Sequence, residues 1–145
     1  MNLLVLDASF AVKWFLPEKV ETLTTVALAL LRRHCKNEIQ IIAPDLFWVE
    51  FASVLWKAIR RGKFPKASAD AALASLSQYE FPRFPTMNLL SKAFEIATAY
   101  ERTVCDCLYV ALAVQTDSQL ITADEHLANA LAAHLPVKWL GAFHE

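Results

Sequence analysis

The sequence predicts an α/β fold in which a mainly parallel sheet is covered by helices. Short apolar runs, typical of strands buried on both faces, alternate with longer segments in which apolar residues recur every three or four positions. Hydrophobic residues make up 56% of the chain, which is ample for a core and argues against disorder. Because no linker or internal repeat is evident, residues 1–145 are expected to form one domain.

The N-terminal half begins with LLVL at residues 3–6, an unbroken apolar run that predicts the first strand. Apolar side chains at mixed spacings of three and four predict a helix over residues 18–34. The run IQIIA at 39–43 predicts a second strand. A helix over 44–61 is then expected, because its Pro-Asp start suits a first turn and Gly62 favours its end.

In the C-terminal half, an Ala-rich segment predicts a small helix at 66–79, and two prolines restrict 80–85 to a short edge strand or a loop. Thr86 and Thr103 are suitable N-caps for the two helices that follow. The remaining elements continue the alternation of helical periods and apolar runs. They are helices at 87–101, 104–116 and 125–134, and strands at 119–123 and 137–141.

Composition and charge exclude some classes of function. The chain has only two glycines, so neither a GxGxxG nor a Walker-type phosphate loop can be formed. The net charge is −1, so nucleic-acid binding would depend on a local patch. One basic cluster either is a solvated helix end that complements the helix dipole or contacts phosphates. Its members are Lys57, Arg60, Arg61, Lys63 and Lys66, to which Lys13 and Lys92 could add.

Cysteine usage and the N-terminus predict a cytoplasmic protein. Three cysteines do not make a disulfide framework, and Cys105 and Cys107 lie about 200° apart on a helix, so they cannot hold one ion together. The N-terminal segment lacks the cationic start of a signal peptide and carries Asp7 within its apolar run. No segment has the roughly 18–20 apolar residues needed to cross a bilayer.

Two aspartates follow directly on predicted buried strands. Asp7 ends the first strand, and Asp124 ends the strand at 119–123. In open parallel sheets, ligands bind beyond the carboxyl ends of the strands, near the point where the strand order reverses. Each aspartate by itself could equally cap the helix that follows it. Two matching positions in one sheet favour a shared site.

Two further carboxylates come from predicted helices. Asp106 lies three residues after Thr103, the spacing of a capping box, yet the helix that it opens is so apolar that it must be largely buried. A carboxylate carried into that position needs a partner or a metal ion. Glu50 lies in the apolar stretch LFWVEFASVLW, but it shares a helix face with Ser53 and Lys57 that could be an ordinary solvated stripe.

Together, the four carboxylates predict a site for a divalent cation. Carboxylate oxygens are preferred ligands of Mg²⁺ and Mn²⁺, and four crowded anions repel one another unless a cation neutralises them. Such clusters serve phosphodiester hydrolysis, in which metal ions about 3.5–4 Å apart activate a water and stabilise the leaving oxygen. Ser9 has no histidine near it in the sequence, so a Ser-His-Asp hydrolase is not expected.

Four segments carry a family resemblance. They are VLDAS at 5–9 with VKWF at 12–15, the segment around Glu50 at 43–62, DCLYVALA at 106–113 and LITAD at 120–124. In this order and at this spacing they resemble the PIN domain, and more closely the VapC-type toxin ribonucleases of toxin–antitoxin pairs. The resemblance covers nearly the whole chain, although 63–100 matches only in its helical character. Cys105 and Cys107 depart from the family pattern without removing a carboxylate.

The resemblance implies a three-layer α/β/α sandwich and an endoribonuclease that depends on Mg²⁺ or Mn²⁺. The family's acidic residues fall on Asp7, Glu50, Asp106 and Asp124. Asp7 and Asp106 would hold a first metal ion, and the other two would complete the site. Hydroxyl residues of the family fall on Ser9 and Thr122, which would support the ligating carboxylates.

The same resemblance implies a homodimer and an inhibitory antitoxin whose tail occupies the active groove. RNA affinity would come from the basic cluster and would fall steeply with salt. Two alternatives stay open: a non-catalytic PIN-like module that binds RNA or protein, and a small-molecule phosphohydrolase. The second lacks an Asp-x-Asp nucleophile pattern, since Asp7 is followed by Ala8 and Ser9.

Overall fold

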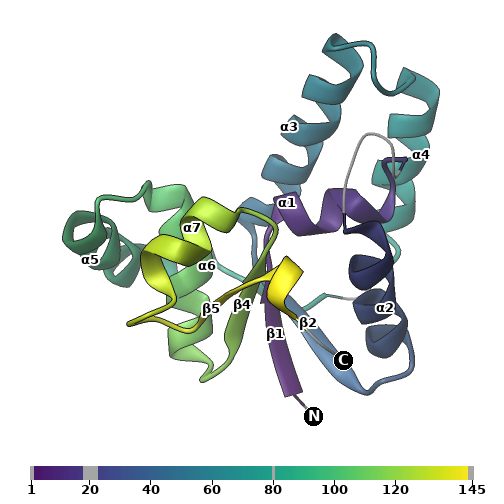
Figure 1. Cartoon of the computed structure of the whole chain (residues 1–145). Helices are drawn as coiled ribbons and strands as arrows, with labels where there is room; N and C mark the ends of the chain where they lie inside the picture. Colours follow the sequence, from purple (N-terminus) through teal and green to yellow (C-terminus); the bar gives the residue numbers. More distant parts are fainter. Residues whose placement is uncertain (1, 18–22, 80, 144–145) are drawn as a thin grey trace.

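Five parallel strands form the central sheet of the computed structural model, which describes residues 2–17, 23–79 and 81–143. The strand order is β3-β2-β1-β4-β5, with β1 in the middle (Figure 1). Apolar residues pair along it, as where Val5 lies beside Ile42 on one side and Leu120 on the other. The strands are β1 (Asn2–Leu6), β2 (Ile39–Pro44), β3 (Arg83–Phe84), β4 (Gln119–Thr122) and β5 (Val137–Trp139).

Helices flank this sheet, and α3 and α4 extend beyond the carboxyl end of β1 (Figure 1). The α-helices are α1 (Ala8–Ala11), α2 (Thr24–Cys35), α3 (Leu46–Arg60), α4 (Lys66–Leu76), α5 (Leu90–Tyr100), α6 (Val104–Gln115) and α7 (Glu125–Leu131). Short 3₁₀ turns cover Val12–Trp14, Thr86–Asn88 and Leu140–Ala142. None of the described helices combines the length and the apolar character that crossing a bilayer requires.

The hydrophobic core confirms what the apolar pattern predicted for helix α6. All seven residues from 107 to 113 are buried, and α6 packs against β1, β2 and β4 as well as α5. The first turn of α6 is thereby held at the carboxyl edge of the sheet. Strand β1 is equally enclosed, with Val5 and Leu6 at most 1% exposed.

Most of the predicted elements are present, with shifted ends. The segment 80–85 was expected to be a short edge strand or a loop; its residues Arg83–Phe84 form the edge strand β3 beside β2, and residue 80 lies outside the described chain. Residues 8–14, for which the sequence suggested no element, form α1 and a 3₁₀ turn that start directly after β1. The helix predicted from 18 is described only from residue 23 onward and begins at Thr24; its first five predicted residues lie outside the described chain.

Two predicted helix starts, those of α3 and α5, were wrong. Pro44 does not open a helix; it is the last residue of β2, beside Phe84 of β3. Thr86 does not cap α5, because its hydroxyl and its backbone N–H both donate to the Asp45 carboxylate. Asp45 therefore ties the end of β2 to the 86–88 turn, a contact between residues distant in sequence that local patterns cannot reveal.

The order of the strands places a ligand site between β1 and β4. From β1 the chain moves outward through β2 to β3, and it then returns to the other side of β1 with β4 and continues to β5. The direction of the connections thus reverses between β1 and β4, and their carboxyl ends border the crevice that such a reversal creates. Asp7 directly follows β1, and Asp124 comes two residues after β4.

Candidate active site

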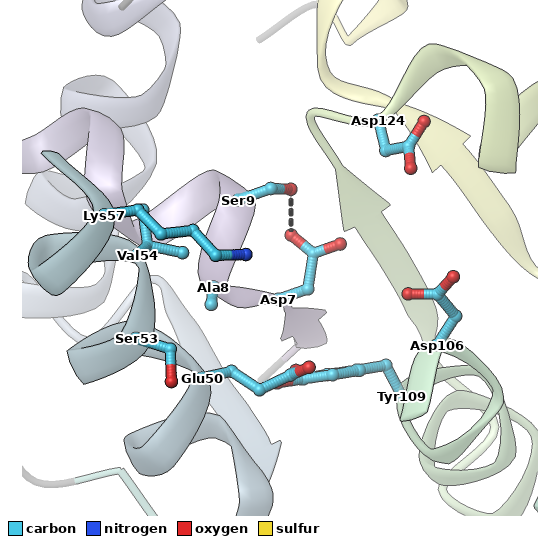
Figure 2. Close-up of a pocket in the computed structure, with 10 residues that line it drawn as sticks. All are labelled: Asp7, Ala8, Ser9, Glu50, Ser53, Val54, Lys57, Asp106, Tyr109 and Asp124. Atoms are coloured by element: carbon cyan, nitrogen blue, oxygen red, sulfur yellow. Dashed lines mark hydrogen bonds between the residues drawn. The ribbon is translucent and has the colours of Figure 1, made fainter. Parts of the chain in front are cut away.

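An open cavity of about 270 Å³ lies beyond the carboxyl ends of β1 and β4. It brings together the four predicted carboxylates, which come from two strand ends and two helices (Figure 2). Residues around it are otherwise mostly small, polar or cationic. The full lining is Asp7, Ala8, Ser9, Glu50, Ser53, Val54, Lys57, Asp106, Tyr109 and Asp124.

Asp7 is fixed by three hydrogen bonds. Its Oδ1 accepts from the Ser9 hydroxyl at 2.6 Å and from the Phe10 backbone N–H at 3.1 Å, so the carboxylate caps α1. Its Oδ2 accepts from the Thr122 hydroxyl at 2.6 Å. The Asp7 side chain therefore both caps α1 and lines the cavity. A carboxylate has about four lone-pair sites, so after three hydrogen bonds one site is left for a ligand in the cavity.

Burial dominates the protonation of Asp7. The residue is 8% exposed. Burial raises the pKa of its carboxyl from 3.8 to about 6, with a smaller upward contribution from the charge of Asp106, while the hydrogen bonds from Ser9, Thr122 and Phe10 lower it. The side chain thus carries its negative charge at a cost, which a cation in the cavity would offset.

Asp106 faces the cavity, and only half of the predicted capping box is formed. Its backbone N–H donates to Thr103 Oγ1 at 3.1 Å, so Thr103 caps α6. The Asp106 carboxylate does not bond back to the Thr103 backbone N–H, and it lines the cavity instead (Figure 2). Burial raises the pKa of this carboxyl and the charge of Asp124 adds to the rise, whereas the neighbouring Thr103 side chain and Arg102 lower it.

Asp124 combines the same two arrangements as Asp7. It is the N-cap of α7, where Oδ1 accepts from the Leu127 N–H at 3.2 Å, and it lines the cavity. Its backbone N–H donates to Thr122 Oγ1 at 3.0 Å. Since the Thr122 hydroxyl in turn donates to Asp7, this buried threonine links the ends of β1 and β4.

Glu50 belongs to the cavity rather than to a plain solvated stripe. It is half-buried, and its Oε1 accepts a hydrogen bond of 2.6 Å from the hydroxyl of Tyr109 on α6. Tyr109 is itself 2% exposed, and burial together with this bond raises the pKa of its phenol. Tyr109 was not among the predicted site residues. The signal for it is a hydroxyl three residues after Asp106, on the same face of an otherwise apolar helix.

The basic cluster is divided by the structure. Lys57 lines the cavity, whereas the rest of the cluster does not. Arg60 lies over the ring of Trp56, 5.1 Å from its centre, and Lys66 pairs with Asp70 at 2.8 Å. These two cations are therefore engaged on the outer surfaces of α3 and α4.

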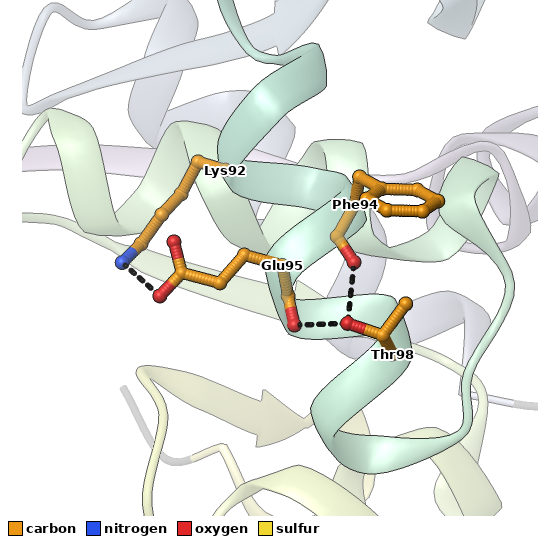
Figure 3. A network of polar contacts seen from close by, with 4 residues as sticks. All are labelled: Lys92, Phe94, Glu95 and Thr98. Atoms are coloured by element: carbon orange, nitrogen blue, oxygen red, sulfur yellow. Dashed lines mark hydrogen bonds and ion pairs between the residues drawn. The ribbon is translucent and has the colours of Figure 1, made fainter.

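The two further basic candidates lie outside the cavity. Lys92 pairs with Glu95 at 3.6 Å on the surface of α5, one turn along the same helix (Figure 3). Lys13 is only 5% exposed. Neither side chain lines the acidic cavity, and their contribution to RNA binding stays a prediction.

The donor set suits a hard, hydrated cation. Among the described residues, no three acidic, histidine or cysteine side chains form a group that could ligate an ion directly. The cavity is large enough for an ion that keeps several waters, at about 30 Å³ per water, and Mg²⁺ usually keeps several. Four carboxylates that face one cavity thus fit an ion bound partly through water.

The cysteines take no part in this arrangement. Cys105 is exposed and Cys107 is buried, so they point to different sides of α6, and both are free thiols. Burial, with a smaller contribution from the charge of Asp106, raises the pKa of the Cys107 thiol to about 11 against the opposing effect of Arg102. Neither thiol lines the cavity. The interpretation as a packing residue is confirmed for Cys107, which is buried, and is wrong for Cys105, whose side chain is exposed.

Known proteins share both the sequence pattern and the fold. The sequence model described as the PIN domain matches residues 4–131. A curated relative named Ribonuclease VapC3, from Pyrobaculum aerophilum, is 31% identical over 134 residues, covering 90% of this chain and 95% of its own. The residues matched by the PIN model include all four carboxylates.

Solved structures share the fold at low sequence identity. One is a protein from Pyrobaculum aerophilum, with a TM-score of 0.69 and 20% identity over 97% of this chain and 85% of its own. Another is the Rickettsia felis VapBC2 structure, bound to a fragment of promoter DNA, with a TM-score of 0.63 and 12% identity over 94% of this chain and 98% of that one. Identities this low support the fold alone.

Proposed function

Because this chain belongs to the PIN domain family, we propose that it is a divalent-metal-dependent endoribonuclease and the toxin of a type II toxin–antitoxin pair. The observation that carries the proposal is the convergence of Asp7, Glu50, Asp106 and Asp124, from four separate segments, on one cavity. The activity in the name of the VapC3 relative, whose match extends over 90% of this chain, points to RNA as the substrate.

The four carboxylates would hold the metal, with Asp7 and Asp106 as its principal ligands and Asp124 and Glu50 completing the site. When bound, Mg²⁺ or Mn²⁺ supplies water activation and charge neutralisation at the phosphate. The chain's own contribution is placement. Ser9 and Thr122 fix Asp7, and the capping of α6 by Thr103 leaves the Asp106 carboxylate to the cavity.

RNA binding would rest on the basic end of α3. Lys57, Arg60, Arg61 and Lys63 lie on or just after this helix, so a strand that reaches the cavity would pass close to them. Each phosphate contact displaces counterions, and log affinity should fall by roughly 0.7 per contact for each unit of log salt with a single strand.

The assembly in which the enzyme works is also part of the proposal. A cytoplasmic homodimer inhibited by a cognate antitoxin fits the relation to VapC proteins, and solved relatives of the same fold include a toxin–antitoxin complex from Klebsiella pneumoniae. The exposed apolar side chains Val49 and Trp56 on α3 and Leu73 on α4 line one open cavity on the surface. Exposed apolar side chains that gather into a patch are typical of protein–protein contacts.

The decisive experiment measures RNA cleavage with Mg²⁺ or Mn²⁺, with EDTA, and by Asp7→Asn. Asp70→Asn is a matched control, because Asp70 is an exposed aspartate on α4 outside the cavity. We expect cleavage that EDTA and Asp7→Asn abolish and Asp70→Asn leaves intact. Cleavage by Asp7→Asn at the wild-type rate would overturn the site, and a wild type inactive with both ions would overturn the function.

One observation favours the non-catalytic alternative. Among the described residues the carboxylates are not gathered into a group that could ligate an ion directly, as a binding module without metal chemistry would allow. Calorimetric titration with Mn²⁺ separates the two functions. Binding that Asp106→Asn weakens supports the enzyme, whereas no heat of binding at millimolar Mn²⁺ supports the module.

A further inference from the structure

Lys57 is the cation that the fold brings into the acidic cavity. It stands seven residues after Glu50 on α3, which places both side chains on the same face, two turns or roughly 10 Å apart. Figure 2 shows its side chain extending into the cavity, with the ammonium directed toward Ser9 and Asp7. The side chain spans from the outer end of α3 toward the end of β1.

The ammonium of Lys57 has no partner of its own among the described residues. On its helix the neighbours at three and four positions are Val54 and Ser53 before it and Arg60 and Arg61 after it, so no acid can pair with it there. No carboxylate of the described chain lies within ion-pair distance of it. Lys57 is thus attracted toward the acidic cavity without being bound by it.

The charge of the cavity explains why such a cation would be needed. Four carboxylates line it, and one divalent ion would neutralise only two of their charges when all are ionised. A phosphate entering the cavity would still meet net repulsion, which a nearby ammonium reduces. Among the described residues that line the cavity, Lys57 alone carries a positive charge.

We propose that Lys57 is a further catalytic residue, whose ammonium contacts a non-bridging oxygen of the phosphate being cleaved. This inference rests on the proposed ribonuclease function. In the reaction a water oxygen forms a bond to phosphorus, one phosphoester bond breaks, and the water proton passes to solvent or the leaving oxygen. Lys57 keeps its protons throughout; it supplies fixed positive charge where negative charge develops.

The role differs from that of the remaining basic cluster. Arg60, Arg61 and Lys63 lie outside the cavity, so they would contribute to RNA affinity through other phosphates. The contribution of Lys57 would be realised at the reacting phosphate, and its loss would lower the rate of cleavage even when all the enzyme has RNA bound.

The test compares Lys57→Met with Lys57→Arg, Lys63→Met and Lys36→Met in the full-length protein. Lys36 is an exposed lysine at the end of α2, outside the cavity, and serves as the unaffected control. Single-turnover cleavage at saturating RNA with Mn²⁺ is measured, together with RNA affinity at several salt concentrations. Circular dichroism confirms that each variant is folded.

We expect Lys57→Met to lower the saturated cleavage rate by about 10- to 100-fold, somewhat less than the loss of a buried oxyanion donor because the side chain is exposed. Lys57→Arg should recover most of the rate, because the positive charge is retained. Lys63→Met should weaken RNA affinity and reduce the slope of log affinity against log salt by the amount that corresponds to about one phosphate contact. Lys36→Met should cleave like the wild type.

Titration with Mn²⁺ gives a readout independent of cleavage. Removing a positive charge beside the cation site should leave Mn²⁺ affinity equal or stronger in Lys57→Met. If the wild type cleaves RNA and Lys57→Met cleaves it at the same saturated rate, the inference is overturned. A Lys57→Met variant that cleaves slowly but has also lost Mn²⁺ binding would overturn it as well. A wild type that does not cleave RNA is the separate result that overturns the proposed function.

Discussion

Replacing Asp7 by Asn should stabilise the metal-free protein at neutral pH and destabilise it in acid. Asp7 is 8% exposed, and burial raises its pKa from 3.8 to about 6. A carboxyl whose pKa is raised in the folded state binds protons more tightly there than in the unfolded chain. Its unfavourable contribution is absent below pH 3.8, grows between pH 3.8 and 6, and is complete above pH 6.

The magnitude follows from that pKa difference and from the hydrogen bonds. A shift of roughly two units corresponds to about 3 kcal/mol of lost stability above pH 6. Asn can keep the bonds from Ser9 and Phe10 with its oxygen, but its amide replaces the acceptor for Thr122, which costs about 1 kcal/mol. We therefore expect Asp7→Asn to be about 2 kcal/mol more stable at pH 8 and about 1 kcal/mol less stable near pH 4.

Urea unfolding in EDTA, from pH 4 to 8, measures this difference. Asp70→Asn is the control, because its exposed pair with Lys66 should change stability by less than about 0.5 kcal/mol at any pH. With saturating Mn²⁺ the order at pH 8 should reverse, because the wild type gains binding free energy that Asp7→Asn loses. A stability difference independent of pH would refute the inference that the buried charge of Asp7 is costly.

Three further predictions concern the helix that carries the central aspartate. Thr103→Ala removes the N-cap and should lower the free energy of unfolding by about 1 kcal/mol. Urea unfolding measures this change, and a midpoint equal to that of the wild type would contradict the capping role. Tyr109→Phe deletes one hydroxyl and should cost about 1–2 kcal/mol, because a half-buried carboxylate loses its donor; thermal unfolding measures it, and no change would show that water replaces the bond. In native protein a thiol reagent should label Cys35 and Cys105 promptly and Cys107 only on unfolding, so three equally fast thiols would contradict the burial of the third.

The sequence identified the carboxylates because their positions follow from local rules. A buried parallel strand is a short apolar run, and the first polar residue after it must emerge at the carboxyl edge of the sheet, as Asp7 and Asp124 do. The cap of Thr103 on α6 is likewise a contact over three residues. Such contacts can be predicted from the sequence because the interacting groups are close together along the chain.

The tertiary structure decided which way a side chain faces wherever the local sequence pattern suits both solvent and the cavity. Glu50 and Lys57 share a face of α3 that is equally suited to solvent or to a cavity, and only the packing of α3 beside α1 and the hydrogen bond from Tyr109 turn that face inward. The basic residues are neighbours in the sequence, yet they lie at different positions around α3. Lys57 therefore reaches the cavity, whereas Arg60 packs on Trp56.

The sequence by itself therefore determined the fold class, the approximate places of the strands and which four acids come to line the cavity. What it could not determine was which way Asp106 points, because a capping box and a metal ligand need the same residue at the same spacing. The fold resolved this by letting the hydroxyl of Thr103 satisfy the backbone, which leaves the Asp106 carboxylate to the cavity. The direction in which a side chain such as Asp106 points depends on packing between segments that are distant in sequence, and this packing exists only once the chain has folded.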